Sequence, residues 1–578
     1  MTILTDRDLT AEEQKKCTAQ IIIDLRQTGI QSTHQDAILQ WLDRSDKVKV
    51  NGIAVKDFCA IKGESYWLHV RARIFYRLFR MAQQLDRLPT DLDLTMVTEI
   101  YTHSAAIPFW RVLIPHANLH VVPLHDQKKK RPVRFSLSYL KHLLQLSYAL
   151  NKLPKEGIWV FSNIFYNQLG ADGVMTDRVF DPLLTALGPN ARRLELLPIP
   201  PKGLEQLPHL LRQPQTPYPN TTLDAILIKF LLYHPQKIFH TLWQIGKYHR
   251  RLNNKTIIQG TFTTLPPFWE SQFRDALSQS SASIPVLHLV KQSLHRFFGE
   301  KNPTAVIGSS ENNSIGRTVV EAAKTWGIPT IGYQHGSIDR HNADYRFAPH
   351  DIPAAIPDLF CCWGDEVREY LVSECHYPPE KTVTVGRLVT GLEAGVVPND
   401  QITRFKDAQQ RPILLFASQA QGMFDEVRTL SGPLLAQFCV QNHFSCVVKP
   451  HPRETDDGLY RQAFAEAGII DRLLEIQDGL FPMLAAADVG ATCYSTVGWE
   501  MMWMGLPLLL LDPLKLDLLK LRSAPFVYTI SGHKDPPFRV WMEHLAEHKA
   551  AGKQAAIQKL GPLEGNAAAR ILALLHKP

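Results

Sequence analysis

The chain has 578 residues, too many for one hydrophobic core, which predicts two to three domains. With 45% hydrophobic and 21% charged residues, its composition is that of a soluble globular protein and excludes a disordered chain. The formal charge of +7 is a mild excess that fits a phosphorylated substrate or an anionic membrane surface, and it is too small to indicate nucleic-acid binding.

The N-terminal stretch MTILTDRDLTAEEQKKC is polar and charged, so it does not read as a secretory signal peptide. The sequence has no run of about 18 apolar residues, so we predict no membrane-spanning helix. None of the eight cysteines forms a Cys-x-x-Cys pair or has zinc-site spacing, so we expect them to be small, buried apolar side chains. So few cysteines in a long chain fit a reducing compartment. We therefore expect a cytoplasmic protein without a metal site, able to associate peripherally with the inner membrane.

Residues 1–90 are predicted to form a mainly helical extension. Thr10 and the acids after it are typical of a helix start, and Tyr66–Leu85 has apolar residues at helical spacing. Leu92–Ile100 and Leu119–Pro123 are the first predicted strands.

Segment 128–155 combines a basic run, Lys128–Arg131, with a leucine-rich amphipathic stretch, Leu137–Leu153. A basic amphipathic helix of this kind can lie on an anionic membrane. We favour the simpler interpretation, a helix packed on its own domain beside a solvated basic loop, and keep peripheral membrane contact as the alternative.

From Gly157 the pattern changes to strand, helix, strand. Ile158–Phe161 and Thr304–Gly308 are apolar strands, and Gly316–Trp326 is a helix that leads into the strand of Gly327–Gly332. This βαβ rhythm implies a parallel sheet. Residues 91–345 are therefore predicted to be a Rossmann-like acceptor domain with insertions.

Residues 346–578 repeat the rhythm and are predicted to be a second Rossmann-like domain, which binds the donor. Its expected strands are Leu359–Trp363, Lys381–Val385, Ile413–Ala417, Phe444–Lys449, Asp488–Thr492 and Leu506–Leu511. The fold class is thus α/β, with two doubly wound parallel sheets facing a cleft. Since ligands of such sheets bind at the carboxyl ends of the strands, the chemistry is expected in the loops that follow them.

Two candidate catalytic residues follow strands of the first sheet. Glu311 comes shortly after Gly308 and is either a general base for an acceptor hydroxyl or a surface or capping residue. His335 follows the strand that ends at Gly332, beside a glycine that allows close approach of a ligand, and is either catalytic or structural.

Two loops of the second sheet carry donors suited to phosphate oxygens. In Lys449-Pro-His-Pro-Arg453, two prolines stiffen a loop with three basic side chains. In Tyr494–Glu500, Ser495 and Thr496 begin a helix, and Glu500 lies one turn in, within reach of a ribose or sugar hydroxyl. A rigid surface loop and a plain helix cap are the alternatives.

The two loops together form a clamp of protein donors that can replace a metal ion in stabilising a nucleoside-diphosphate leaving group. The sequence contains no Asp-x-Asp triplet, and Asp456-Asp457 is a lone acidic pair. We therefore predict metal-independent chemistry with no cofactor other than a nucleotide-sugar substrate.

These motifs resemble those of a known enzyme group. Gly327–Gly336, Cys362-Trp-Gly364 with Val385-Gly386, Lys449-Pro-His-Pro452, and Tyr494-Ser-Thr with Glu500 and Gly505-Leu-Pro look like bacterial capsule and surface-polysaccharide glycosyltransferases of the GT-B fold. The same string is similar to CDP-glycerol glycerophosphotransferases and bacterial polysialyltransferases. The resemblance covers Thr304 to Pro513, a little over a third of the chain.

The resemblance implies that His451, Ser495 and Thr496 hold the donor's phosphates and that His335 lies across the cleft. The expected donor-binding residues are Gln334, Gly336, Gly386, Lys449, His451, Arg453, Ser495, Thr496 and Glu500. The chain departs from the group in having Ser-Thr where two serines are expected. Its acidic-acidic-Gly string, Asp456–Gly458, lies in the donor domain rather than the N-terminal one, which argues against sialic acid as the sugar.

In the predicted reaction, Glu311 or His335 removes a proton from a saccharide or lipid-linked saccharide acceptor, which attacks the anomeric carbon of the donor sugar. Three alternatives stay open: transfer of a polyol phosphate from a CDP-activated donor, a non-catalytic scaffold in polysaccharide assembly or export, and a nucleotide-sugar epimerase.

Overall fold

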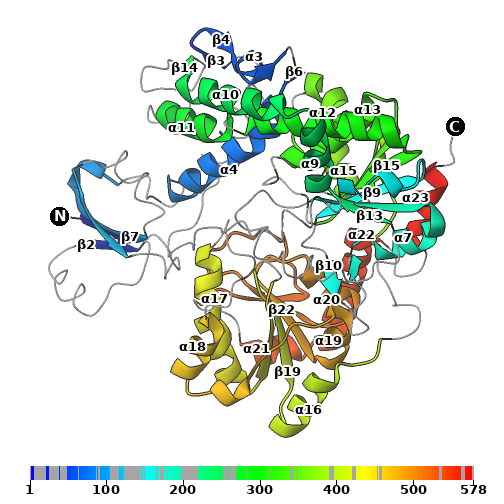
Figure 1. Ribbon diagram of the computed structural model, residues 1–578. Helices are drawn as coiled ribbons and strands as arrows, with labels where there is room; N and C mark the ends of the chain where they lie inside the picture. Colours follow the sequence, from blue (N-terminus) through cyan, green and yellow to red (C-terminus); the bar gives the residue numbers. More distant parts are fainter. Residues whose placement is uncertain are drawn as a thin grey trace. The chain divides into compact units, whose positions relative to one another are not determined.

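A computed structural model gives the fold of the chain (Figure 1). It describes residues 2–5, 21–24, 38, 48–62, 64–85, 88, 92–103, 116–122, 144, 147–148, 150–163, 167–169, 175–177, 179–196, 219–251, 258–259, 269–281, 283–309, 311–336, 338, 342, 344–347, 349–388, 396–419, 425–451, 454, 458–517, 519–532, 537–561 and 566–575.

The chain divides into two compact units. The first unit comprises Met1–Thr176, Leu187–Tyr333 and Arg340–Phe360, and the second comprises Asp177–Ala186, Gln334–Asp339 and Cys361–Pro578. Both are α/β and each is built on a large sheet, so the predicted fold class, with two doubly wound sheets, is confirmed. The cleft between the sheets and the domain boundaries after residues 90 and 345 stay predictions.

The second unit contains a six-stranded sheet in the order β21-β20-β19-β22-β23-β24, in which every neighbouring pair is parallel. The strands are β19 (Ile413–Ala417), β20 (Ser445–Lys449), β21 (Leu473–Glu475), β22 (Val489–Thr492), β23 (Leu508–Leu511) and β24 (Val527–Ile530). In chain order this is 3-2-1-4-5-6, the arrangement of dinucleotide-binding folds. The continuous apolar runs of β19 and β23 are fully buried, as expected for parallel strands covered on both faces.

Helices connect these strands. They are α17 (Asp425–Asn442), α18 (Leu459–Glu466), α19 (Leu480–Ala486) and α20 (Val497–Trp503). Helix α16 (Asp400–Gln409) precedes β19, and α21 (Phe538–Met542), α22 (Leu545–Leu560) and α23 (Ala567–Leu575) follow β24.

A seven-stranded sheet has the order β13-β12-β9-β15-β16-β17-β18, and its strands from β13 to β16 pair in parallel. The strands are β9 (Ile158–Asn163), β12 (Ala191–Leu196), β13 (Asn220–Thr222), β15 (Ala305–Gly308), β16 (Thr330–Tyr333), β17 (Leu359–Cys362) and β18 (Thr382–Thr384). Its helices include α9 (Leu223–Tyr233), α10 (Gln236–Arg251), α11 (Trp269–Ser281), α12 (Ile284–Lys301), α13 (Ser314–Lys324) and α15 (Asp365–Ser373).

The membership of two strands differs from the prediction. β17 and β18 were expected in the donor sheet, but they extend the seven-stranded sheet beyond β16. An apolar run predicts a buried strand but not the strand beside which it lies. That position depends on how the connecting segment crosses over the sheet. The six-stranded sheet of the second unit is completed by β21 and β24, two edge strands that the sequence did not reveal because edge strands need no long apolar run.

The N-terminal region combines the predicted helix with strands. Helix α4 (Trp67–Leu85) matches the predicted helix at Tyr66–Leu85. Strands β1 (Thr2–Thr5) and β2 (Ile21–Asp24) form a four-stranded parallel sheet with β7 (Val97–His103) and β8 (Asn118–Val122). Their isoleucines and threonines favour the strand over the helix expected there.

Two further expectations concern the whole chain. The seven cysteines within the described residues are buried and take part in no disulfide bond, which confirms their predicted role as small buried side chains. No helix in the described ranges is long and apolar enough to cross a membrane. Most of the basic segment 128–155, including Lys128–Arg131, lies outside the described residues.

Gly308 is needed at the end of β15, because a Cβ atom there would overlap the ring of Phe161 on the neighbouring strand β9. We expect Gly308→Ala to lower the unfolding free energy by about 1–3 kcal/mol through overpacking. Gly246→Ala in α10, where a Cβ meets nothing within 4 Å, is the control and should be neutral or stabilising. Chemical denaturation of the three proteins measures the difference, and equal behaviour of the two variants would contradict the packing argument.

Candidate functional site

The carboxyl ends of three adjacent strands in the second unit lie at the same level. Ala417, the last residue of β19, is in register with Lys449 of β20 on one side and with Thr492 of β22 on the other. Between β19 and β22 the strand order reverses direction, and in open α/β sheets this switch point is where ligands bind. The candidate site is therefore the edge formed by the loops after β19, β20 and β22.

Side chains at this edge fasten the loops to one another. Gln419, directly after β19, donates from Nε2 to Oγ1 of Thr492 over 2.8 Å and to the carbonyl of Ala417 over 3.0 Å. The Thr492 hydroxyl donates to the same Ala417 carbonyl over 3.1 Å and accepts from the backbone N–H of Ser495 over 3.3 Å. Gln419 and Thr492 are buried, so these bonds fix the two loops at the switch point.

The loop that carries His451 is held by its backbone. Its N–H donates to Oγ of Ser418 over 2.8 Å and to a carboxylate oxygen of Glu454 over 3.0 Å. The Ser418 hydroxyl donates to the same Glu454 oxygen, and Nε of Arg428 donates to the other over 2.6 Å. The Glu454 carboxylate thus ties α17 and the ends of β19 and β20 together. The half-buried His451 side chain extends from this anchored backbone.

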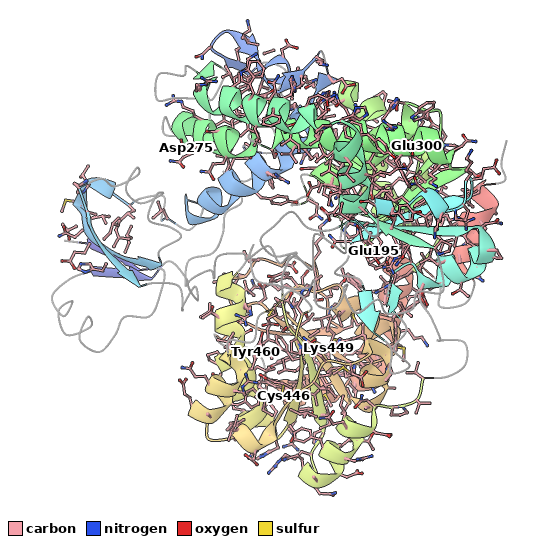
Figure 2. The ribbon with its side chains drawn as sticks, in the orientation of Figure 1. Glu195, Asp275, Glu300, Cys446, Lys449 and Tyr460 are labelled. Carbon is pink, nitrogen blue, oxygen red and sulfur yellow. The ribbon has the colours of Figure 1, made fainter. Side chains whose placement is uncertain are left out.

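Lys449 ends β20 (Figure 2), and its Nζ donates to the carbonyl of Asp478 over 2.5 Å. This bond orients the Lys449 side chain at the end of β20. Arg453, the third basic residue of the predicted motif, lies outside the described residues.

The hydroxyl pair lies where α20 begins. Oγ of Ser495 accepts a hydrogen bond from the backbone N–H of Val497 over 3.3 Å, while Thr496 makes no capping bond. Both residues are half-buried. The N-cap residue of α20 is therefore Thr496 rather than Ser495, and the Thr496 hydroxyl caps no backbone N–H, whereas the Ser495 hydroxyl contacts the first turn from one position earlier. Because α20 has only seven residues, the side chains rather than its dipole carry the argument for a phosphate site.

Glu500 is 1% exposed and forms an ion pair with Arg387. The Arg387 guanidinium lies over the ring of Trp363, 4.9 Å from its centroid. A buried carboxylate needs such a partner, since removing it from water is otherwise costly. Glu500 was predicted to contact a ribose or sugar hydroxyl, and the structure shows that its carboxylate is already paired with Arg387.

The loop after β16 joins the same cluster through Trp363. Oε1 of the buried Gln334 accepts from the Trp363 backbone N–H over 2.8 Å, and its Nε2 donates to the carbonyl of Gly336 over 2.9 Å. This arrangement positions the half-buried His335 between two fixed residues. Among the described residues, no atom lies within 4 Å of where a Cβ of Gly336 would be.

Gly386 has a packing role. Its φ of +84° is in the left-handed region that favours glycine, and a Cβ there would lie 2.7 Å from the Arg570 guanidinium. Its N–H donates to the carbonyl of Trp363 over 3.0 Å. Gln334, Gly336, Gly386 and Glu500 are therefore brought together through Trp363 and Arg387, neither of which the sequence analysis assigned to the site.

In the first unit, Glu311 lies in the turn between β15 and α13. Its side chain is 4% exposed and packs against Gly332, where a Cβ would come 3.1 Å from its Cγ. Burial raises the pKa of Glu311 to about 8, with the nearby Asp344 adding to the rise and its own backbone N–H and Arg317 opposing it. Within the described residues, Oε2 of Glu311 has no hydrogen-bond partner.

Glu311 is thus neither a surface residue nor a cap. The cap of α13 is Asn313, whose side chain accepts from the backbone N–H groups of Ile315 and Gly316 over 3.0 and 2.8 Å. A carboxyl group with a pKa near neutrality is suited to general-base work, although its burial keeps it away from solvent.

The sequence analysis missed Ser418, Gln419, Arg387 and Glu454. Ser418 and Gln419 directly follow a predicted strand, so the strand-end rule that selected Lys449 also applies to them. Arg387 follows the predicted strand Lys381–Val385 by two residues, so the same rule applies to it. Glu454 had no such signal, because only its contacts with Ser418 and Arg428 reveal its part. In the described ranges no group of three or more His, Cys, Asp or Glu side chains is placed to hold a metal ion.

No protein-family model and no curated protein sequence matches the chain. Solved structures with a similar arrangement include a UDP-GlcNAc 2-epimerase from Neisseria meningitidis bound to UDP-GlcNAc, with 13% identity, a TM-score of 0.42 and coverage of 73% of this chain and 100% of that chain. HepE from Anabaena in complex with UDP and glucose has 10% identity and a TM-score of 0.42, and the match covers 72% of this chain and 99% of that chain.

A glycosyltransferase from Rickettsia africae has 9% identity and a TM-score of 0.40, with coverage of 73% of this chain and 98% of that chain. At such identities and TM-scores these similarities carry no argument about what the present chain binds or does.

The Arg387–Glu500 pair gives a stability prediction. Arg387→Met leaves the Glu500 carboxylate buried without its partner, and we expect a loss of about 3–5 kcal/mol. Adding Glu500→Gln removes the charge and should restore part of the stability. Melting temperatures of the two single variants and the double variant measure the coupling. Strictly additive effects would show that the pair does not act as a unit.

Glu311 predicts a pH dependence. Between about pH 4.5 and 8 the folded chain keeps a proton that the unfolded chain has released, so this residue lowers stability as pH rises, by up to about 1.4 kcal/mol per unit. Glu311→Gln removes this effect, so its melting temperature should rise relative to wild type across that window and stay parallel above it. The exposed Glu374→Gln is the control, and parallel curves for wild type and Glu311→Gln throughout would refute the burial argument.

Proposed function

We propose that this chain is a metal-independent glycosyltransferase of the GT-B type, which transfers a sugar from a nucleotide-sugar donor to a growing bacterial surface polysaccharide. The observation that supports this most is the edge of the six-stranded sheet. There, three strand-end loops at the switch point are hydrogen-bonded to one another and present Lys449, His451 and Ser495.

The proposed donor site stabilises the leaving nucleoside diphosphate. Lys449 supplies a positive charge, and His451 and the Ser495 and Thr496 hydroxyls supply hydrogen-bond donors for phosphate oxygens. Because the loops are anchored before a ligand arrives, these groups need little reorganisation as negative charge develops in the transition state. Protein donors then do the work that a metal ion does in other enzymes.

The proposed acceptor chemistry needs one base. While it is buried, Glu311 keeps its own proton near neutral pH, because burial raises its pKa to about 8. Acceptor binding that opens the packing around the side chain lowers this pKa, and the resulting carboxylate takes the proton of the acceptor hydroxyl. His335 is the other candidate. The polysaccharide nature of the acceptor, a saccharide or lipid-linked saccharide, rests on the motif resemblance.

The donor class can be measured by thermal shift with CMP, CDP, UDP, GDP and dTDP. We expect one nucleotide to raise the melting temperature of wild type in the presence of EDTA, since a ligand at about 100 times its Kd stabilises by about 2.7 kcal/mol. His451→Ala should lose this shift. His443→Ala, at the opposite end of β20, is the matched control and should keep it.

The outcomes separate the alternatives. A shift with CDP only favours transfer of a polyol phosphate, and product analysis with a CDP-polyol then distinguishes attack on phosphorus from attack on carbon. Conversion of a nucleotide sugar to its epimer without an acceptor would identify an epimerase. If no nucleotide shifts the wild type, the nucleotide-site proposal fails and a scaffold becomes the better interpretation.

A further inference from the structure

Helix α10 of the first unit turns its apolar stripe toward solvent. Ile238, Phe239, Leu242 and Trp243 recur at helical spacing and are all exposed, with Phe239 at 76% and Trp243 at 53%. Leu232 and Tyr233, at the end of the preceding helix α9, are exposed as well. These six residues, here called the α9–α10 face, form a cluster of large apolar side chains that are all exposed in the described part of the structure.

The opposite side of α10 is the one that packs. Tyr248 is 2% exposed, donates from its hydroxyl to the carbonyl of Ala60 over 3.1 Å and meets Phe58 edge to face. Lys237 donates from Nζ to Oε1 of Gln292 on α12 over 2.9 Å, and α10 runs beside α11 and α12 (Figure 1). A different face of α10 therefore anchors the helix, and the apolar stripe lies on its outer side.

The segment that carries the α9–α10 face is basic. From Ala225 to Arg251 the sequence contains five Lys and Arg residues and no Asp or Glu. Nζ of Lys247 lies 5.3 Å from the ring centroid of Trp243, and the guanidinium of Arg296 lies 5.1 Å from that of Tyr233. Glu300 of α12 (Figure 2) is already engaged, pairing with Lys229 and Arg296 at 2.8 Å each.

We infer that the α9–α10 face docks this protein on an anionic lipid membrane. An exposed stripe of Trp, Phe, Leu and Ile beside Lys and Arg is the composition of helices that lie in the plane of a bilayer interface. The aromatic rings enter the headgroup and upper acyl region, while the basic side chains stay at the level of the lipid phosphates. The lack of acids over 27 residues favours an anionic surface over the mixed charges of a protein partner.

The test is sedimentation of the full chain with phosphatidylcholine vesicles, with and without phosphatidylglycerol. Wild type should bind the vesicles that contain phosphatidylglycerol, and less at high salt. Phe239→Ser with Trp243→Ser should reduce the partition coefficient by on the order of tenfold or more, since two buried aromatic side chains are lost. Ile470→Ser with Val540→Ser, which removes two exposed apolar residues of the second unit, is the matched control and should bind as wild type.

A second pair of variants tests the charges. Lys247→Glu with Arg250→Glu should weaken binding to the anionic vesicles, whereas Arg404→Glu with Lys553→Glu, which changes the net charge equally on the exposed surface of the second unit, should not. For every variant, the melting temperature without nucleotide reports on folding, and the shift on adding nucleotide reports on the donor site. A variant that loses vesicle binding but keeps both values has lost only its membrane-binding surface.

Several results would overturn the inference. Wild type that binds neither vesicle type is one, and unchanged binding of the Phe239→Ser, Trp243→Ser variant is another. Release by charge reversal at Lys128–Lys130 only would assign the membrane contact to segment 128–155. If sedimentation velocity shows a dimer that the aromatic variant converts to a monomer, the α9–α10 face is covered by a second copy instead.

Discussion

The parallel pairing of β19 with β20 on one side and β22 on the other is the constraint on which the candidate site depends. It places Lys449, Ala417 and Thr492 at one level, with β20 and β21 on one side of β19 and β22 to β24 on the other. The Ala417 carbonyl at the end of β19 accepts hydrogen bonds from the side chains of Gln419 and Thr492, and the Ser418 hydroxyl accepts one from the His451 N–H. These bonds fix the loops that follow the strands.

Buried charge is handled in two ways in this chain. In the second unit, Glu454 and Glu500 each face an arginine, so their charges are compensated within the fold. In the first unit, burial without a hydrogen-bonded partner for one oxygen raises the pKa of Glu311. Paired carboxylates of the first kind organise loops, whereas a carboxyl group of the second kind has a proton affinity suited to exchange near neutral pH.

The α9–α10 face shows how a structure changes the meaning of an amphipathic pattern. The periodicity of α10 is that of any helix packed on a core, and its usual consequence is an inward apolar stripe. Here Tyr248 and Lys237 occupy the packed side, and Phe239 and Trp243 remain outside. The direction of the stripe depends on which neighbours the helix meets, and these come from distant parts of the chain.

The sequence by itself determined the α/β class, the central strands of both sheets, and several residues at their carboxyl ends, among them Lys449, His451, Ser495 and Glu311. These follow from local patterns, because a short apolar run must be buried and a polar loop must follow it. Only the tertiary structure decided that β17 and β18 extend the first sheet, that Arg387 holds Glu500, and that Glu311 is buried. Strand neighbours, ion-pair partners and burial are properties of residues far apart in the chain, and a local pattern contains no information about which of them will meet.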